Sequence, residues 1–158
     1  MGTYAGVDRR FDFKIKNNRH VFLSDYGHHP KEILQSAKSL KELYGNRKVT
    51  VIFQPHLYTR TRDFYKEFAD ALSHFDEVIL TEIYPAREEP IPGVTSALIY
   101  DNLRKGIEKQ MIKKDDVLDF VRSRDFDVLV VLGAGNLDNY VPQITEIIQE
   151  KEKQESKK

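Results

Sequence analysis

Residues 127–132 read Asp-Val-Leu-Val-Val-Leu, and this stretch decides the fold class of the chain. Five of its six residues are apolar, and the turn sequence GAGN follows directly at 133–136. An uninterrupted apolar strand of this kind is typical of a parallel sheet that helices cover on both faces. The stretch therefore predicts a central strand of an α/β domain.

Strands and helices alternate on both sides of this stretch. Apolar runs predict strands at Lys48–Phe53 and Glu77–Ile83. Helical spacing of apolar residues predicts helices at Pro30–Tyr44, at Thr61–Ser73, after Thr95 or Ser96, after Asp115 or Asp116, and through Val141, Ile144, Ile147 and Ile148. Strands that alternate with helices form a parallel sheet with right-handed crossovers.

The first residues predict a hairpin instead. Apolar and polar residues alternate in Arg10–Lys16, RFDFKIK, as they do in a half-buried strand. Asn17 and Asn18 suit a tight turn, and Val21–Leu23 continues as a second strand. We therefore expect an α/β fold, a three-layer Rossmann-like domain whose mainly parallel sheet carries one antiparallel strand from this N-terminal hairpin.

The composition excludes several classes of protein. The 158 residues have the size of one domain. Because 25 Lys and Arg balance 25 Asp and Glu, the chain lacks the basic excess of proteins whose main partner is nucleic acid. The absence of cysteine excludes disulfides and thiolate metal sites. No apolar run approaches the roughly 20 residues that span a bilayer, so no membrane partner is expected.

Residues that carry chemistry gather in the joins that lead from a strand to a helix. These joins read SDYGHHP at 24–30, QPHLYTRT at 54–61, YPAREEPIPG at 84–93 and GAGN at 133–136. In a parallel sheet all such joins emerge at the carboxyl edge of the strands, which is where open α/β sheets bind their ligands. The sequence therefore predicts a binding site at this edge.

Two of the joins supply the candidate side chains. Asp25 and His28 have the chemistry to bind a ligand, whereas His29 is predicted to cap the helix that follows it. His56 and Arg60 suggest a site for an anion, because arginine binds a carboxylate or phosphate through two hydrogen bonds. The alternative for Arg60 is a surface ion pair with Asp or Glu.

The remaining joins carry weaker signals. Thr59 or Thr61 is predicted to cap the helix after the second join. In the third join, Glu88 and Glu89 are expected to be solvated charges on a loop that prolines stiffen. None of the eight glycines precedes Lys-Ser or Lys-Thr, so the chain has no P-loop, and ATP chemistry would need another domain.

Five motifs together resemble the C-terminal domain of the Mur ligase family, the ATP-dependent ligases of peptidoglycan synthesis. In chain order they are GVDRRFDF (6–13), DYGHHPKEI (25–33), FQPHLYTRTRDF (53–64), EIYPAREEPIPGVTS (82–96) and GAGN (133–136). DYGHHP and QPH-x-YTRT resemble the members that add L-alanine. The resemblance implies a Rossmann-like fold, in agreement with the pattern of strands and helices.

The resemblance also implies a function for a longer protein. It implies an enzyme of the cytoplasm that joins L-alanine to UDP-N-acetylmuramate through an acyl phosphate, with ATP and Mg²⁺ bound mainly by a central P-loop domain. On this basis residues 1–8 end an interdomain linker, 9–150 form the C-terminal domain and 151–158 form a solvated, charged tail. The partners are the N-terminal and central domains, and the isolated chain is expected to be inactive.

Motif by motif, the resemblance assigns roles to single residues. Arg10 resembles an arginine that reaches the ATP phosphates, Asp25 an aspartate that holds the ribose, and Tyr26 a residue beside the adenosine. His28 is similar to a residue of the adenosine and alanine region, and we place it with the substrate-binding set.

His56 and Arg60 match positions around the incoming L-alanine and its carboxylate. Many relatives have arginine where this chain has Leu57. Either Arg60 works alone or another cation, Arg62 or Arg87, substitutes, and Arg87 is the stronger candidate because relatives usually have glycine there.

Two alternatives are kept beside this interpretation. Asp25, His28 and His56, with His29 and Glu82, could serve a metal-dependent hydrolase domain, although they lack a ligand spacing such as H-x-x-x-H. A non-catalytic module that binds an acidic peptide or a nucleotide is the other.

Overall fold

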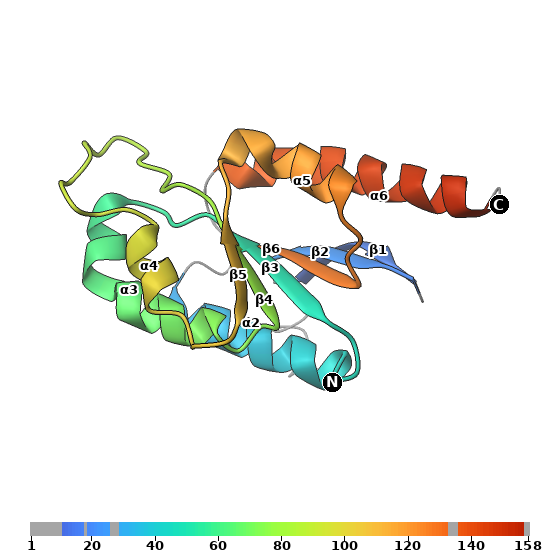
Figure 1. Ribbon diagram of the computed structural model, residues 1–158, viewed down its shortest axis with the longest axis horizontal. Coiled ribbons are helices and arrows are strands. Elements are labelled where there is room, and N and C mark those ends of the chain that lie inside the picture. The colour runs from blue at the N-terminus through green and yellow to red at the C-terminus, as the bar shows by residue number, and fades with distance from the viewer. Residues whose placement is uncertain (1–10, 18, 26–28, 133–135, 157–158) are drawn as a thin grey trace, which may run out of the picture.

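A computed structural model describes residues 11–17, 19–25, 29–132 and 136–156 of the chain. Its centre is a six-stranded sheet with the order β1-β2-β6-β3-β4-β5 (Figure 1). The strands are β1 (Phe11–Lys16), β2 (Val21–Asp25), β3 (Val49–Phe53), β4 (Glu77–Leu80), β5 (Glu108–Met111) and β6 (Val128–Leu132). Strands β1 and β2 pair antiparallel and the other neighbours pair parallel, which confirms the predicted fold class and the N-terminal hairpin.

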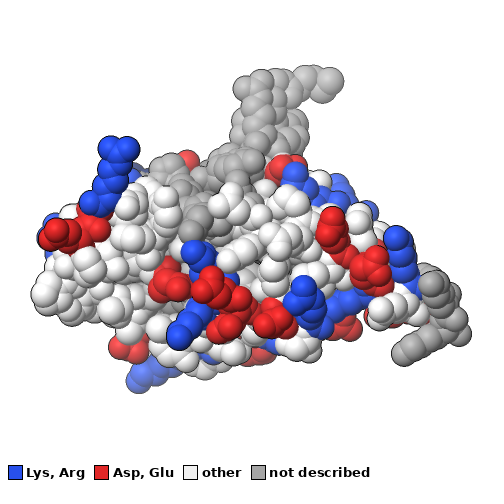
Figure 2. Space-filling view, turned by 90° about the horizontal axis from the view of Figure 1, so that it is seen from above, with Lys and Arg blue, Asp and Glu red and all other residues white. Residues whose placement is uncertain are grey.

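Helices form a layer on each face of the sheet (Figure 1). Three of them cover one face: α2 (Pro30–Leu43), α3 (Tyr58–Leu72) and α4 (Ala97–Asp101). The opposite face is covered by α5 (Val117–Ser123), which follows the short turn η2 (Lys114–Asp116), and by α6 (Val141–Ser156), which follows η3 (Asn136–Tyr140). Figure 2 shows acidic and basic side chains interspersed over the face with α5 and α6, in keeping with the zero net charge.

The apolar stretch at 127–132 lies where its pattern predicts. Strand β6 is buried along its whole length between β2 and β3. Val128 and Val130 pack into the core under α2 and α3, while Leu129 and Val131 pack into the core under α5 and α6. Because successive side chains of a strand point to opposite faces, both cores need apolar residues, and the alternation of polar and apolar residues disappears.

Strand β5 is an element that the sequence did not reveal. Its four residues are largely exposed, and it pairs with β4 at the edge of the sheet. An edge strand with little burial has no need of an apolar pattern, so periodicity does not detect it. The helix predicted after Ser96 is also shorter than its apolar spacing indicated, because it ends at Asp101, before Leu103.

The predicted solvated tail at 151–158 is wrong as far as Ser156, because α6 continues to that residue. Lys151 donates hydrogen bonds to the carbonyl oxygens of Val121, at 2.6 Å, and of Arg124, both at the end of α5. Glu152 lies 2.8 Å from Nδ1 of the buried His20 and belongs to the same packed surface. A lysine near a helix C-terminus can satisfy carbonyls that have no helical partner. These charged residues therefore pack against the domain instead of extending into solvent.

A buried carboxylate lies at the amino end of β4. Glu77 is 5% exposed, and its oxygens accept hydrogen bonds from Arg124 at 2.8 and 3.1 Å and from the Thr50 hydroxyl at 3.1 Å. Burial raises the pKa of Glu77, but the hydrogen bonds and charge of Arg124, with help from Lys48 and Thr50, outweigh burial and leave the pKa below its usual value.

This ion pair predicts a pH dependence of stability. Because the pKa of Glu77 is lower in the folded chain, its contribution is complete above the usual value of 4.5 and is lost as the pH falls through the folded-state pKa. We expect Glu77→Gln to cost about 1–3 kcal/mol at pH 7 and to flatten the loss of stability below pH 5, measured by urea unfolding. Glu150→Gln is the control, because the side chain of Glu150 is 67% exposed and lies 4.0 Å from Lys153. An equally steep acid response in Glu77→Gln would contradict the assignment.

Candidate functional site

The carboxyl ends of the parallel strands are in register across the sheet. Asp25 at the end of β2 pairs with Leu132 of β6, which also pairs with Phe53 of β3. Phe53 pairs in turn with Leu80 of β4, and Leu80 with Met111 of β5. All the joins that follow these strands therefore leave the sheet at one edge, here called the carboxyl rim. The prediction that these joins share an edge is confirmed.

Asp25 lies at the carboxyl rim, but inside the fold. It is 2% exposed, and the hydroxyl of Ser36 in α2 donates a hydrogen bond to its Oδ2. The carboxylate is therefore fixed between the sheet and α2. Arg10, Tyr26 and His28 lie outside the described residues, as do the glycines of GAGN, so their assigned roles stay predictions.

His29 caps α2, as predicted. Its Nδ1 accepts a hydrogen bond from the backbone N–H of Lys31 at 3.3 Å, and its own N–H donates to Glu32 at 3.1 Å. This reciprocal pair is a capping box. The His29 ring also lies 5.8 Å from the ring of Phe64 in α3, so it joins the two helices at the rim.

His56 is held against the next join along the rim. Its ring stacks on that of Tyr84, with centroids 5.5 Å apart and planes 21° apart. The backbone N–H of Leu57 donates to the Tyr84 carbonyl at 2.8 Å, and the Tyr84 N–H donates to the Pro55 carbonyl at 2.8 Å. These contacts extend the β3–β4 pairing beyond the strands and fix His56 at the rim.

Arg60 lies in the first turn of α3, four residues after His56. Within the described part of the chain, no carboxylate lies close enough to Arg60 to form an ion pair, whereas Arg62 pairs with Asp63 at 2.9 Å. The surface ion pair that was the alternative for Arg60 is therefore not seen. His56 and Arg60 lie on one short segment that follows β3 at the rim.

The N-terminus of α3 is not capped as predicted. The residue before the helix is Leu57, with φ of 72°, and it makes no capping hydrogen bond through its side chain. Thr61 donates its hydroxyl to the Leu57 carbonyl at 3.0 Å instead of capping an N–H. Glu88 supplies the cap: its Oε1 accepts from the N–H of Thr59 at 3.1 Å and its Oε2 from the Thr59 hydroxyl at 2.5 Å.

Glu88 is partly exposed, but two hydrogen bonds from Thr59 fix its carboxylate, which the sequence did not predict. The hydrogen bond from the Thr59 hydroxyl holds the pKa of Glu88 below its usual value, and the backbone N–H groups of the α3 N-terminus add to the effect. Glu89 is exposed, as predicted. Arg87 is also exposed and follows Ala86, which has φ of 54°; its role in amino-acid binding stays a prediction.

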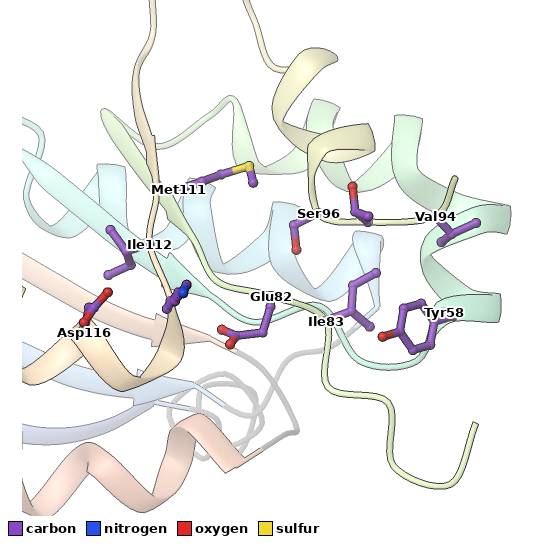
Figure 3. Close-up of a pocket in the computed structure, with 10 residues that line it drawn as sticks. Tyr58, Glu82, Ile83, Val94, Ser96, Met111, Ile112 and Asp116 are labelled. Atoms are coloured by element: carbon purple, nitrogen blue, oxygen red, sulfur yellow. The ribbon is translucent and has the colours of Figure 1, made fainter. Parts of the chain in front are cut away.

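A cavity of about 450 Å³ opens beside these residues, between the ends of β4 and β5 (Figure 3). Its lining is mostly apolar and consists of Tyr58, Glu82, Ile83, Val94, Thr95, Ser96, Met111, Ile112, Lys113 and Asp116. The Ser96 hydroxyl donates to the Thr81 carbonyl at 2.5 Å, and the Lys114 N–H donates to Glu82 at 2.6 Å. The sequence did not reveal this cavity, because one wall comes from β5 and the residues after it.

Two negative observations concern the alternatives. In the described ranges, no three His, Asp or Glu side chains lie close enough together to hold a metal ion, so the metal-hydrolase alternative finds no support. No helix among the described residues has the length and apolar character needed to cross a bilayer.

Comparison with known proteins decides the family. A sequence model for the Mur ligase glutamate ligase domain matches residues 9–135. The chain belongs to the Mur ligase family. It is 65% identical over 151 residues to the UDP-N-acetylmuramate–L-alanine ligase of Phocaeicola vulgatus and 53% identical over 148 residues to that of Parabacteroides distasonis. These matches cover 96% and 94% of the chain, but the chain spans about a third of the length of these curated relatives.

Solved structures agree with this membership in the Mur ligase family. The UDP-N-acetylmuramate–alanine ligase of Thermotoga maritima superposes with a TM-score of 0.71 at 27% identity, over 90% of this chain and 30% of that one. A domain from a putative UDP-N-acetylmuramate:L-alanyl-γ-D-glutamyl-meso-diaminopimelate ligase of Haemophilus ducreyi shares the fold alone, with a TM-score of 0.63 at 17% identity, and the match covers 98% of that chain. The Rossmann-like fold of a Mur ligase C-terminal domain is confirmed.

Proposed function

We propose that this chain is the C-terminal domain of an ATP-dependent ligase that joins L-alanine to UDP-N-acetylmuramate in cytoplasmic peptidoglycan synthesis. The observation that carries the proposal is the 65% identity to a ligase with that name, over nearly the whole chain. The rim adds physical support, because it presents His56 and the arginine of the first turn of α3 on one segment, as a site for a small carboxylate requires.

The reaction needs two displacements. The lactyl carboxylate oxygen of UDP-N-acetylmuramate attacks the γ-phosphorus of ATP, and ADP leaves, which gives an acyl phosphate. The amine nitrogen of L-alanine, after losing a proton, attacks the acyl carbon, and the tetrahedral intermediate expels phosphate to give the amide. Such chemistry depends on positioning and on neutralising charge, rather than on a covalent side chain.

This domain's share is to hold the two small substrates. Arg60, with His56, binds the L-alanine carboxylate. Arg87 takes the place of the arginine that many relatives have at the position of Leu57. The motif assigns the ATP ribose to Asp25, whose carboxylate is buried in this structure and accepts a hydrogen bond from Ser36. Arg10, Tyr26 and His28 complete the set on the evidence of the motifs alone.

ATP phosphates and Mg²⁺ are assigned to the central domain. When bound there, Mg²⁺ neutralises charge on the phosphates. This assignment follows from the resemblance and from the sequence, which contains no P-loop. The partners of this domain are therefore the other two domains of a longer chain.

A direct test compares the isolated 158 residues with the full-length protein. We expect the isolated chain to release no phosphate from ATP above background, because it lacks the phosphate-binding loop. The full-length protein should release phosphate only when both UDP-N-acetylmuramate and L-alanine are present. Substrate-dependent phosphate release by the isolated chain, or release by the full-length protein that ignores L-alanine, would refute the proposal.

A further inference from the structure

Two neighbouring loops of the carboxyl rim are bound to each other by side chains and backbone. The rings of His56 and Tyr84 stack, and two backbone hydrogen bonds join the loops. In addition, both carboxylate oxygens of Glu88 accept hydrogen bonds from Thr59. Glu88 lies 29 residues after Thr59, so this cap comes from the tertiary structure and not from the residue before the helix.

The backbone on both sides of this contact is unfavourable. Leu57 and Ala86 are the non-glycine residues with positive φ in the described part of the chain, at 72° and 54°. Residues with a Cβ enter this region at a cost, and they stay there only when surrounding contacts hold them. Leu57 immediately precedes α3, and Ala86 lies two residues before Glu88, so the carboxylate links the two strained turns.

The first turn of α3, which Glu88 holds through Thr59, also carries Arg60, the cation that the proposed function assigns to L-alanine. Thr59 and Arg60 are consecutive residues in the first turn of α3, where the helix has backbone N–H groups without helical acceptors. A carboxylate there satisfies those donors and is favoured by the helix dipole. Without it, the start of α3 would depend on water, and the direction of Arg60 would depend on a strained turn.

We propose that Glu88 is a positioning residue of the ligase: by capping α3 from the neighbouring loop, it sets the place of Arg60 and hence the affinity for L-alanine. This inference rests on the proposed function, because Arg60 must contact L-alanine for Glu88 to matter. Glu88 itself touches no substrate in this scheme. It acts through Thr59, and its effect should therefore appear in one substrate only.

The test uses steady-state kinetics of the full-length protein with all three substrates varied in turn. We expect Glu88→Ala to raise the KM for L-alanine by about 5- to 20-fold, because loss of the cap loosens the first turn of α3 that carries Arg60. The KM values for ATP and UDP-N-acetylmuramate should change by less than about twofold, since those substrates do not use this turn. Thr59→Val, which removes the hydroxyl but keeps the N–H, should give a smaller rise of about 2- to 5-fold.

Glu89→Gln is the matched control, because Glu89 is the exposed neighbour of Glu88 and should leave every constant unchanged. Thermal unfolding of each variant separates loss of fold from loss of position. A variant that only unfolds would lower the active fraction, and thus kcat, without a selective rise in the KM for L-alanine.

A double variant distinguishes failure of this inference from failure of the proposed function. If Glu88 acts through Arg60, adding Glu88→Ala to Arg60→Ala should change the KM for L-alanine by less than about twofold. If the rise in the KM for L-alanine in the double variant equalled the product of the two single rises, the inference would be overturned. A KM for L-alanine equal to that of the parent protein in both Glu88→Ala and Thr59→Val would also overturn it. If Arg60→Ala alone left that KM unchanged, the proposed role of Arg60 would fail, and the positioning role would fail with it.

Discussion

Replacing Arg60 by alanine in the full-length protein is expected to raise the KM for L-alanine by about 10- to 100-fold. A hydrogen bond to a charged group contributes about 1.5–3 kcal/mol, and each 1.4 kcal/mol is a factor of ten in affinity. The expectation follows from the place of Arg60 in the first turn of α3, where the described part of the chain offers it no carboxylate partner. Initial rates at varied L-alanine, with ATP and UDP-N-acetylmuramate saturating, measure the effect.

Arg62→Ala is the matched control for this measurement. Arg62 lies two residues further along α3, carries the same charge and pairs with Asp63 at the surface. Its replacement should leave the KM for L-alanine within about twofold, because exposed ion pairs contribute little. Arg60→Lys should recover only part of the affinity, since lysine lacks the two-pronged geometry. Equal KM values in Arg60→Ala and Arg62→Ala would show that Arg60 does not bind the carboxylate.

The second large effect is expected in stability. Lys151→Ala combined with Glu152→Ala should lower the free energy of unfolding by about 2–3 kcal/mol, which for a domain of this size lowers Tm by roughly 5–12 °C. The first change leaves the carbonyls at the end of α5 without their donor, and the second removes the carboxylate that lies 2.8 Å from Nδ1 of the buried His20. Urea or thermal unfolding of the 158-residue chain measures the loss.

Lys153→Ala provides the comparison for the double variant. Its side chain is 72% exposed and its ammonium lies 4.0 Å from Glu150, a contact that contributes little in water. If the charged end of α6 were a solvated tail, both proteins would unfold at the temperature of the parent chain. A selective loss in the double variant would show that this end of α6 is part of the domain.

Much of the fold could be predicted because its core elements carry strong local patterns. The apolar run at 127–132, the alternation at 10–16 and the helical spacing at 30–44 each reflect burial on defined faces. Strand β5 carries no such pattern, because most of its side chains face water. The end of α6 was misjudged for a similar reason: its charges have partners in other elements, which no pattern along the chain reveals.

The site was predicted in part, and the reason is again physical. Register across parallel strands obliges the joins after them to share one edge, so the positions of Asp25 and His56 at the rim follow from the order of strands and helices. The motifs supplied their proposed roles. The sequence did not reveal which polar side chains of the rim stabilise the fold and do not bind a ligand. Glu88 is the example, because it caps a helix that begins 30 residues earlier in the chain.

The order of residues and their local burial were enough to predict the class of fold, the edge of the sheet that carries the chemistry, and the resemblance to the Mur ligases. Three features appear only in the folded chain: Glu88 caps the start of α3, Lys151 satisfies carbonyls at the end of α5, and β5 forms one wall of a cavity beside the residues after β4. The N–H and carbonyl groups at helix ends form hydrogen bonds with whatever partner lies nearby. Which partner lies nearby depends on how the whole chain packs, and no local pattern in the sequence reveals it.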